Sequence, residues 1–102
     1  MITKIRKRDG REVPFNIEKI TNAIFKAAVA AGGSDYHTAE SLAEQVAETL
    51  EHGKEKVPSV EEIQDTVEKT LIESGHARTA KKFILYRAER TRIREKNTQL
   101  MK

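Results

Sequence analysis

The chain has 102 residues, enough for a single domain built around one hydrophobic core. Its residues are 37% hydrophobic and 34% charged, which indicates a charged, helix-rich globular protein, and the absence of cysteine excludes disulfides, thiolate metal sites and thiol nucleophiles. The net charge of +3 conceals two basic ends (five basic residues against one acidic in 1–11, eight against two in 78–96) and an acidic middle, a distribution that favours an anion-binding site.

Residues 2–15 are predicted to form a β-hairpin. Asp9-Gly10 is a strong two-residue turn signal, because a type I′ turn needs positive φ at both of its central positions. The return strand, residues 11–15, contains Pro14, which has no N–H to donate to a sheet. We therefore expect Pro14 at an edge or at the end of the strand.

Four helices are expected after the hairpin, because apolar residues recur at helical spacing between glycine stops. Asn16 is a suitable N-cap for the first helix, and Ser34 or Asp35 for the second. Ser59 and Glu62 form a capping box that opens the third helix, and the fourth follows the next glycine.

One further strand is predicted through Val57, because residues 54–58 are too few for a helix. The order β-β-α-α-β-α-α predicts a mainly helical α+β fold, in which a four-helix bundle is capped by a small three-stranded sheet. The last helix is expected to bury Ala80, Phe83, Ile84 and Ala88. Beyond residue 90 the apolar positions run out, so residues 1–90 are assigned to the domain and 91–102 to a polar tail or connector.

The first basic end could hold an anion. Lys7, Arg8 and Arg11 surround the predicted turn, and cations together with free turn amides suit a polyphosphate. Lys19 lies one turn into the first helix, where the helix dipole disfavours a cation but favours a bound anion. Taken alone, each feature also fits a solvated basic surface.

The second basic end places Arg87, Arg90 and Arg94 at i, i+3 and i+7, on one face of the last helix. This face fits phosphate binding, but it also fits a solvated surface paired with acids of the middle helices, or a nucleic-acid-binding surface. No aromatic residues interleave with the arginines to stack on bases, which argues against nucleic acid.

Neither catalysis nor a metal site is expected. Glu61 and Glu62 are adjacent and point in different directions from a helix, so they do not form a carboxylate dyad. No phosphate-binding glycine loop or nucleophile elbow is present, and the three histidines lack ligand spacing. No signal peptide or membrane-length apolar run is found either, which predicts a cytoplasmic protein that does not bind membranes.

Two segments of the chain resemble the ATP-cone family. The first is Ile5-x-Lys7-Arg8-Asp9-Gly10-Arg11-x-x-Pro14-Phe15-Asn16-x-x-Lys19-Ile20-x-x-Ala23-Ile24, and the second joins Val57-Pro58-Ser59-Val60-Glu61-Glu62-Ile63-Gln64-Asp65 to Ala80-x-x-Phe83-Ile84-x-Tyr86-Arg87. The first motif is specific, because the Lys-Arg-Asp-Gly turn and the Asn-x-x-Lys helix start occur together at the family's spacing. The resemblance covers about residues 2–90.

The resemblance implies a regulatory domain that binds ATP as activator or dATP as inhibitor, together with Mg²⁺, and that performs no chemistry. Lys7, Arg8 and Lys19 would contact the phosphates, whereas Ile5 and the region of Val60 would line the base and ribose pocket. The full site that the resemblance implies contains Ile5, Lys7, Arg8, Asn16, Lys19, Val60, Arg87 and Arg90, the last two being the weaker members.

In that family the effector controls a ribonucleotide reductase, usually through a change in oligomeric state. The implied partners are therefore a reductase catalytic domain or subunit and further copies of the chain. Residues 86–95 look most like the exit from the cone of an anaerobic (class III) ribonucleoside-triphosphate reductase. Two other functions stay open, a small basic nucleic-acid-binding domain and a helical interaction module without a nucleotide.

Overall fold

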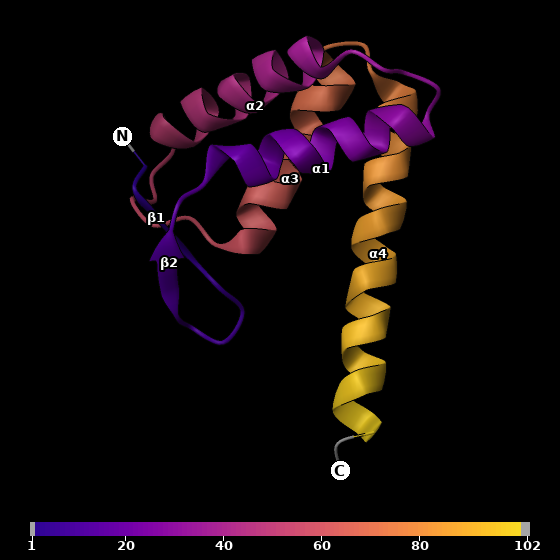
Figure 1. Ribbon diagram of the computed structural model, residues 1–102. Coiled ribbons are helices and arrows are strands. Elements are labelled where there is room, and N and C mark those ends of the chain that lie inside the picture. The colour runs from indigo at the N-terminus through magenta and orange to yellow at the C-terminus, as the bar shows by residue number, and fades with distance from the viewer. Residues whose placement is uncertain (1, 101–102) are drawn as a thin grey trace.

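The computed structural model describes the backbone of residues 2–100 and the side chains of residues 2–90, 92 and 93. Its elements follow one another as a two-stranded hairpin and four helices (Figure 1). In chain order they are β1 (Lys4–Arg6), β2 (Glu12–Pro14), α1 (Ile17–Ala30), α2 (Tyr36–Glu51), α3 (Val60–Glu73) and α4 (Ala77–Leu100). The prediction of a mainly helical α+β fold with four helices is confirmed.

The hairpin is antiparallel, and Ile5 pairs with Val13 at its centre. The predicted type I′ turn is wrong, because no residue other than glycine has positive φ in the described chain and in this turn only Gly10 does, at 89°. The Gly10 N–H donates to the Lys7 carbonyl at 2.9 Å, which closes a tight turn that ends in a left-handed glycine. The end of β2 at Pro14 is confirmed.

The predicted third strand is wrong, and the sheet has two strands. What remains of it is a single parallel bridge between Arg6 and Ser59, with the Arg6 N–H donating to the Pro58 carbonyl at 2.9 Å. Pairing stops there because Pro58 has no N–H and Ser59 already caps α3. A single backbone bridge therefore stands where a three-stranded cap was expected.

Local side-chain bonds set the helix starts. Asn16, Asp35 and Ser59 each accept a hydrogen bond from a backbone N–H two or three residues further on, at 3.0 to 3.1 Å. All three were predicted as caps. For the second helix the prediction left Ser34 and Asp35 as alternatives, and the cap is Asp35. Since a lost cap costs about 1 kcal/mol, these contacts fix where each helix begins.

Each helix packs against two others: α1 and α3 both contact α2 and α4. Ile24, Val46 and Leu71, from α1, α2 and α3, are among the most completely buried side chains. Burying residues of this size stabilises the fold by roughly 1.5–3 kcal/mol each. The core is thus shared by the helices, and Ile5 and Phe15 of the hairpin segment pack against its edge.

Helix α4 differs from the prediction. Ala80 and Phe83 are buried as expected, but Ile84 is 43% exposed and Ala88 is exposed, so their predicted burial is wrong. Figure 1 shows the C-terminal half of α4 extending beyond the other three helices, whereas Ile84 lies in the N-terminal half, next to the buried Phe83 but on a side of the helix that is exposed. The backbone remains helical through residues 91–100.

Candidate functional site

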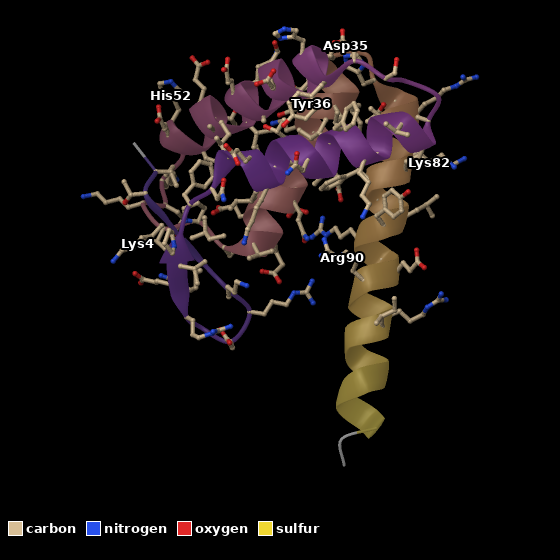
Figure 2. The ribbon with its side chains drawn as sticks, viewed as in Figure 1. Lys4, Asp35, Tyr36, His52, Lys82 and Arg90 are labelled. Carbon is tan, nitrogen blue, oxygen red and sulfur yellow. The ribbon has the colours of Figure 1, made fainter. Side chains whose placement is uncertain are left out.

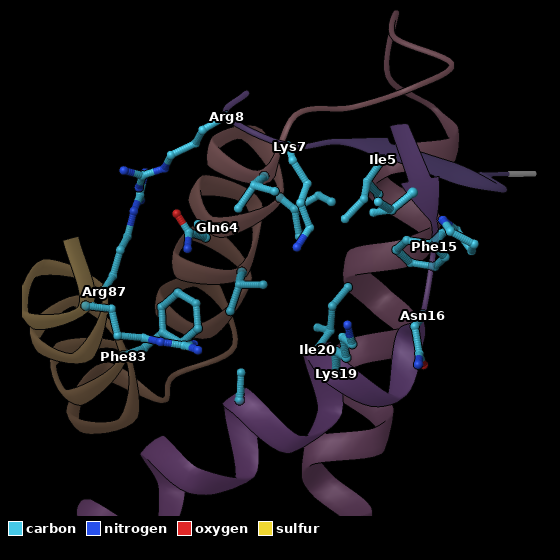
Figure 3. Close-up of a pocket in the computed structure, with 17 residues that line it drawn as sticks. Ile5, Lys7, Arg8, Phe15, Asn16, Lys19, Ile20, Gln64, Phe83 and Arg87 are labelled. Atoms are coloured by element: carbon cyan, nitrogen blue, oxygen red, sulfur yellow. The ribbon is translucent and has the colours of Figure 1, made fainter. Parts of the chain in front are cut away.

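A cavity of about 280 Å³ opens between the hairpin, the start of α1, the first half of α3 and the middle of α4 (Figure 3). All eight residues of the predicted site line it. Its walls are formed by Ile5, Lys7, Arg8, Val13, Pro14, Phe15, Asn16, Lys19, Ile20, Ala23, Val60, Ile63, Gln64, Val67, Phe83, Arg87 and Arg90. Residues up to 85 positions apart in the sequence are therefore brought to one place by the packing of α1, α3 and α4.

The deeper wall of the cavity is apolar. Ile20, Ile63, Val67 and Phe83 line it and belong to the buried core, with Val67 only 2% exposed. On the opposite side Phe15 from the hairpin segment is partly buried. A concave apolar surface with a few polar groups at its edge is the usual form of a small-molecule site.

Two lysines enter the cavity without a carboxylate partner among the described residues. Lys7 follows β1 and hangs from the hairpin into the middle of the cavity, while Lys19 lies beside Asn16 at the start of α1 (Figure 3). The positive end of the α1 dipole points to the same region. Together the two ammonium groups and the helix start form an electropositive edge that suits a phosphate group.

Asn16 caps α1 with one atom of its side chain and also lines the cavity. Its Oδ1 atom accepts the Glu18 N–H at 3.0 Å and so caps α1. The side-chain NH₂ group stays available to donate a hydrogen bond at the cavity wall.

Two arginines at the cavity are already paired with carboxylates of α3. Arg8 from the hairpin turn bonds Glu61 at 2.7 Å. Arg87 from α4 bonds Asp65 at 2.7 Å and Glu68 at 2.8 Å. Their positive charge is therefore partly neutralised before any ligand enters.

The Arg87 cluster holds α3 and α4 together. Burial lowers the pKa of the Arg87 guanidinium, but the hydrogen bonds that it donates to Asp65 and Glu68, together with their negative charges, outweigh burial and raise that pKa above its ordinary value. For the arginine face of the last helix, pairing with acids of the middle helices was one of two alternatives to phosphate binding. The structure shows this pairing for Arg87. Arg90 lines the cavity and makes no ion pair with a described side chain, whereas the side chain of Arg94 lies outside the described residues.

Gln64 was not singled out from the sequence. Its Oε1 atom is buried and has no hydrogen-bond partner among the described residues. An orphaned buried acceptor is costly, by roughly 1–3 kcal/mol, unless a ligand or water donates to it. The signal was present in the spacing, because Gln64 stands four residues after Val60 and three before Val67, on the face of α3 that lines the cavity.

Neither a metal-binding cluster nor a membrane-spanning helix occurs in the described chain. No group of three or more His, Asp or Glu side chains there could hold a metal ion. No helix within residues 2–100 is both long enough and apolar enough to span a membrane.

Comparison with known proteins adds three relatives. A protein-family model described as the ATP cone domain matches residues 3–92. The chain is 48% identical over 100 residues to a vitamin B12-dependent ribonucleoside-diphosphate reductase of Thermoplasma acidophilum, covering 93% of the chain and 13% of that protein. It is 37% identical over 100 residues to an anaerobic ribonucleoside-triphosphate reductase of Salmonella typhimurium, covering 98% of the chain and 14% of that protein.

A third relative is the alpha subunit of a ribonucleoside-diphosphate reductase of Chlamydia pneumoniae, 36% identical over 107 residues, covering 96% of the chain and 10% of that protein. The chain thus spans 10–14% of the length of these relatives. The three relatives are reductases with three different names. One of them is the anaerobic ribonucleoside-triphosphate reductase, the kind of protein that residues 86–95 resemble most.

Proposed function

The chain belongs to the ATP-cone domain family, and from this premise we propose that it binds ATP or dATP in the cavity as an allosteric effector. The observation that carries the proposal is the pairing of an apolar wall with two lysines that have no carboxylate partner in the described chain. A nucleotide has the same two halves, a flat base and a polyanionic tail. The proposed role is regulatory, and the chain is proposed to do no chemistry.

The apolar wall would receive the base. Ile5 and Val60 stand at its edge and Phe83 at its back, so an adenine ring could be covered on both faces. Gln64 would then gain the donor that its buried Oε1 atom lacks, either from the base amino group or from a ribose hydroxyl.

The phosphates would lie against Lys7 and Lys19 at the start of α1. Each charge-assisted contact of this kind contributes about 1.5–3 kcal/mol. The NH₂ group of Asn16 would add a neutral donor, while Arg90 stands at the α4 side of the cavity. Mg²⁺ would be held mainly by the phosphates, since no carboxylate or histidine cluster for it exists in the described chain.

The partner that we propose is the catalytic domain or subunit of a ribonucleotide reductase, because the relatives similar to this chain are named ribonucleoside-diphosphate or ribonucleoside-triphosphate reductases. Nucleotide binding would shift the equilibrium between quaternary arrangements by its differential affinity for them, with further copies of the chain among the contacts. We propose that residues 1–90 form the nucleotide-binding domain, that residues 91–102 are its connector and that the protein works in the cytoplasm.

Isothermal titration of the chain with ATP and with dATP, each with Mg²⁺, tests the proposal. We expect saturable binding with a micromolar Kd, and a ligand at a hundred times its Kd should stabilise the fold by about 2.7 kcal/mol. For a domain of this size that corresponds to a rise in Tm of roughly 10 °C or more.

Absence of both heat and thermal shift with either nucleotide would refute nucleotide binding. Titration of a short DNA duplex and an RNA strand at two salt concentrations tests the nucleic-acid alternative, since phosphate-driven binding weakens steeply with salt, and binding of neither nucleotide nor nucleic acid would favour the helical interaction module. If the chain binds nucleic acid but no nucleotide, it is a nucleic-acid-binding domain.

A further inference from the structure

Gln64 presents an unpaired amide at the cavity. Its buried Oε1 atom has no hydrogen-bond donor among the described residues, and its NH₂ group, which is less buried, has no acceptor there either. No hydrogen bond within the described chain therefore holds the amide in one orientation. Because the terminal torsion of a glutamine is soft, the planar group can turn and offer both its acceptor and its donor to a ligand.

The surroundings of Gln64 in the cavity wall are largely apolar. Ile63 and Val67 from α3 and Phe83 from α4 line the same wall and are buried (Figure 3). An amide in such surroundings costs free energy while it is unpaired, and a ligand that cannot pair with it is rejected. Gln64 can therefore discriminate among the ligands that fit the cavity.

Charge distinguishes the two sides of the cavity. Three arginines of the wall lie on α4 or beside α3: Arg8, Arg87 and Arg90. Two of them bond carboxylates of α3: Glu61, Asp65 and Glu68. Arg90 makes no ion pair with a described side chain, and when it is included the three positive and three negative formal charges on this side cancel. At the hairpin and the start of α1, Lys7 and Lys19 have no carboxylate partner in the described chain, so the phosphates of a nucleotide belong on that side.

The helix arrangement places Gln64 away from those phosphates. Lys19 is on α1 and Gln64 on α3, and these two helices both pack against α2 and α4, so they lie on opposite sides of the helical core. Figure 3 shows the two side chains on opposite walls of the cavity. A nucleotide with its phosphates at Lys19 points its base toward α3, with the ribose in between. The donor that reaches Gln64 therefore comes from the base.

Adenine matches a free amide. Its exocyclic amino group donates and the ring nitrogen beside it accepts, and a glutamine pairs with such an edge through two hydrogen bonds. We propose that Gln64 binds this edge and makes the site selective for bases that carry the amino group. This inference rests on the proposed nucleotide site and adds what that site recognises. Because ATP and dATP carry the same base, Gln64 acts on both alike and does not distinguish them.

Titration calorimetry on the wild-type protein is the first test. ATP is compared with purine riboside triphosphate, which lacks only the exocyclic amino group. We expect this loss to weaken binding roughly ten- to a hundredfold, because the acceptor of Gln64 is then left unpaired beneath the bound base. Equal affinity for the two ligands would overturn the proposal.

Gln64→Met tests whether the glutamine is the group that meets the amino group. Methionine keeps the length of the side chain but removes the amide, so the variant should bind ATP and purine riboside triphosphate with affinities within about twofold of each other. Gln45→Met, at a glutamine of α2 that does not line the cavity, is the matched control and should keep the wild-type preference. A preference for the amino group that survives in Gln64→Met contradicts the proposal.

A third ligand, dideoxy-ATP, tests the ribose as the alternative partner of Gln64. It keeps the base and lacks both sugar hydroxyls, so the ratio of its affinity to that of ATP should be the same in the wild type and in Gln64→Met. If this ratio changes while the preference for the amino group stays, the ribose lies against Gln64 and the proposal is wrong.

Thermal unfolding of the ligand-free variant keeps the test independent of its fold. Gln64→Met removes an unpaired acceptor and leaves the size of the side chain similar, so its Tm should not fall below that of the wild type. A clear fall would show that the fold already uses the amide and would overturn the proposal. If the wild-type protein binds neither ATP nor dATP, the proposed function fails; if it binds ATP and Gln64→Met keeps the full preference for the amino group, this inference alone fails.

Discussion

The two basic regions of the molecule use their positive charge differently. In the hairpin and the start of α1, Lys7 and Lys19 face the cavity with no carboxylate partner among the described residues. In α4, Arg87 lines the same cavity but is held by Asp65 and Glu68 of α3. In the first region the two ammonium groups are left without a carboxylate, whereas in α4 Arg87 joins two helices and Arg90 lines the cavity without an ion pair to a described side chain.

This difference shows that a count of cations around a cavity overstates its attraction for anions. A guanidinium that already bonds two carboxylates must lose them before it can bind a phosphate, so it contributes little net affinity. The sequence already ranked Arg87 and Arg90 below Lys7, Arg8 and Lys19, but it did not show that Arg87 is paired with two acids of α3. Mutations can test whether the first region contributes mainly to ATP affinity and Arg87 mainly to the free energy of unfolding.

The largest effect on binding should come from Lys7→Ala. Loss of one charge-assisted phosphate contact costs about 1.5–3 kcal/mol, so ATP affinity should fall roughly ten- to a hundredfold while the free energy of unfolding stays nearly unchanged. Lys4→Ala is the matched control, because Lys4 sits on the same hairpin but points away from the helices (Figure 2). Titration calorimetry measures both; equal losses for the two variants would mean that Lys7 acts only through the overall charge.

Arg87→Ala should show the opposite pattern. It leaves Glu68, whose side chain is 21% exposed, without its cation, and this should cost about 1–3 kcal/mol of unfolding free energy. ATP affinity should fall by less than about threefold, an effect small enough to be indirect. Urea denaturation gives the stability, with Arg92→Ala, an exposed arginine of the same helix, as control. A large loss of affinity with unchanged stability would place Arg87 on the phosphates.

Asn16→Asp separates the capping of α1 by Asn16 from its proposed role as a hydrogen-bond donor to the nucleotide. Aspartate caps a helix as well as asparagine, so the unfolding free energy should change by less than about 0.5 kcal/mol. The substitution replaces the NH₂ donor by a negative charge beside Lys19, and ATP affinity should fall about tenfold or more. Unchanged affinity would show that Asn16 serves only as the cap of α1.

The smallest effect is expected at Asp35, which caps α2 beyond the far end of α1. Hydrogen bonds from the Thr38 hydroxyl and N–H and from the His37 N–H hold the Asp35 pKa below its ordinary value of 3.8. A lowered pKa contributes stability above pH 3.8, and this contribution is lost as the pH falls through the folded-state pKa.

Asp35→Asn keeps a capping oxygen but removes the titration, so its stability should fall less than that of the wild type as the pH is lowered below 3.8. Thermal unfolding at a series of pH values measures this. ATP affinity at neutral pH should be unaffected, because Asp35 does not line the cavity. Identical pH profiles would show that the cap is not titrating.

Prediction from the sequence succeeded where the deciding contacts are local. Asn16, Asp35 and Ser59 cap their helices through bonds that span two or three residues, so their effect is visible in a short stretch of sequence. The Lys7 turn and Lys19 could likewise be singled out, because both belong to one compact motif. The type of the turn was missed, since an Asp-Gly pair is compatible with more than one hairpin loop.

The sequence by itself therefore determined the four helices, their caps, the hairpin and the family to which they belong. Tertiary structure decided the rest, because the relevant partners are distant in the chain. Pro58 ends the third-strand pairing after one bridge, and Ile84 lies on the exposed side of α4 although Phe83 beside it is buried. Arg87 meets Asp65 and Glu68 only when α3 packs against α4, and that packing determines which cations a ligand can use.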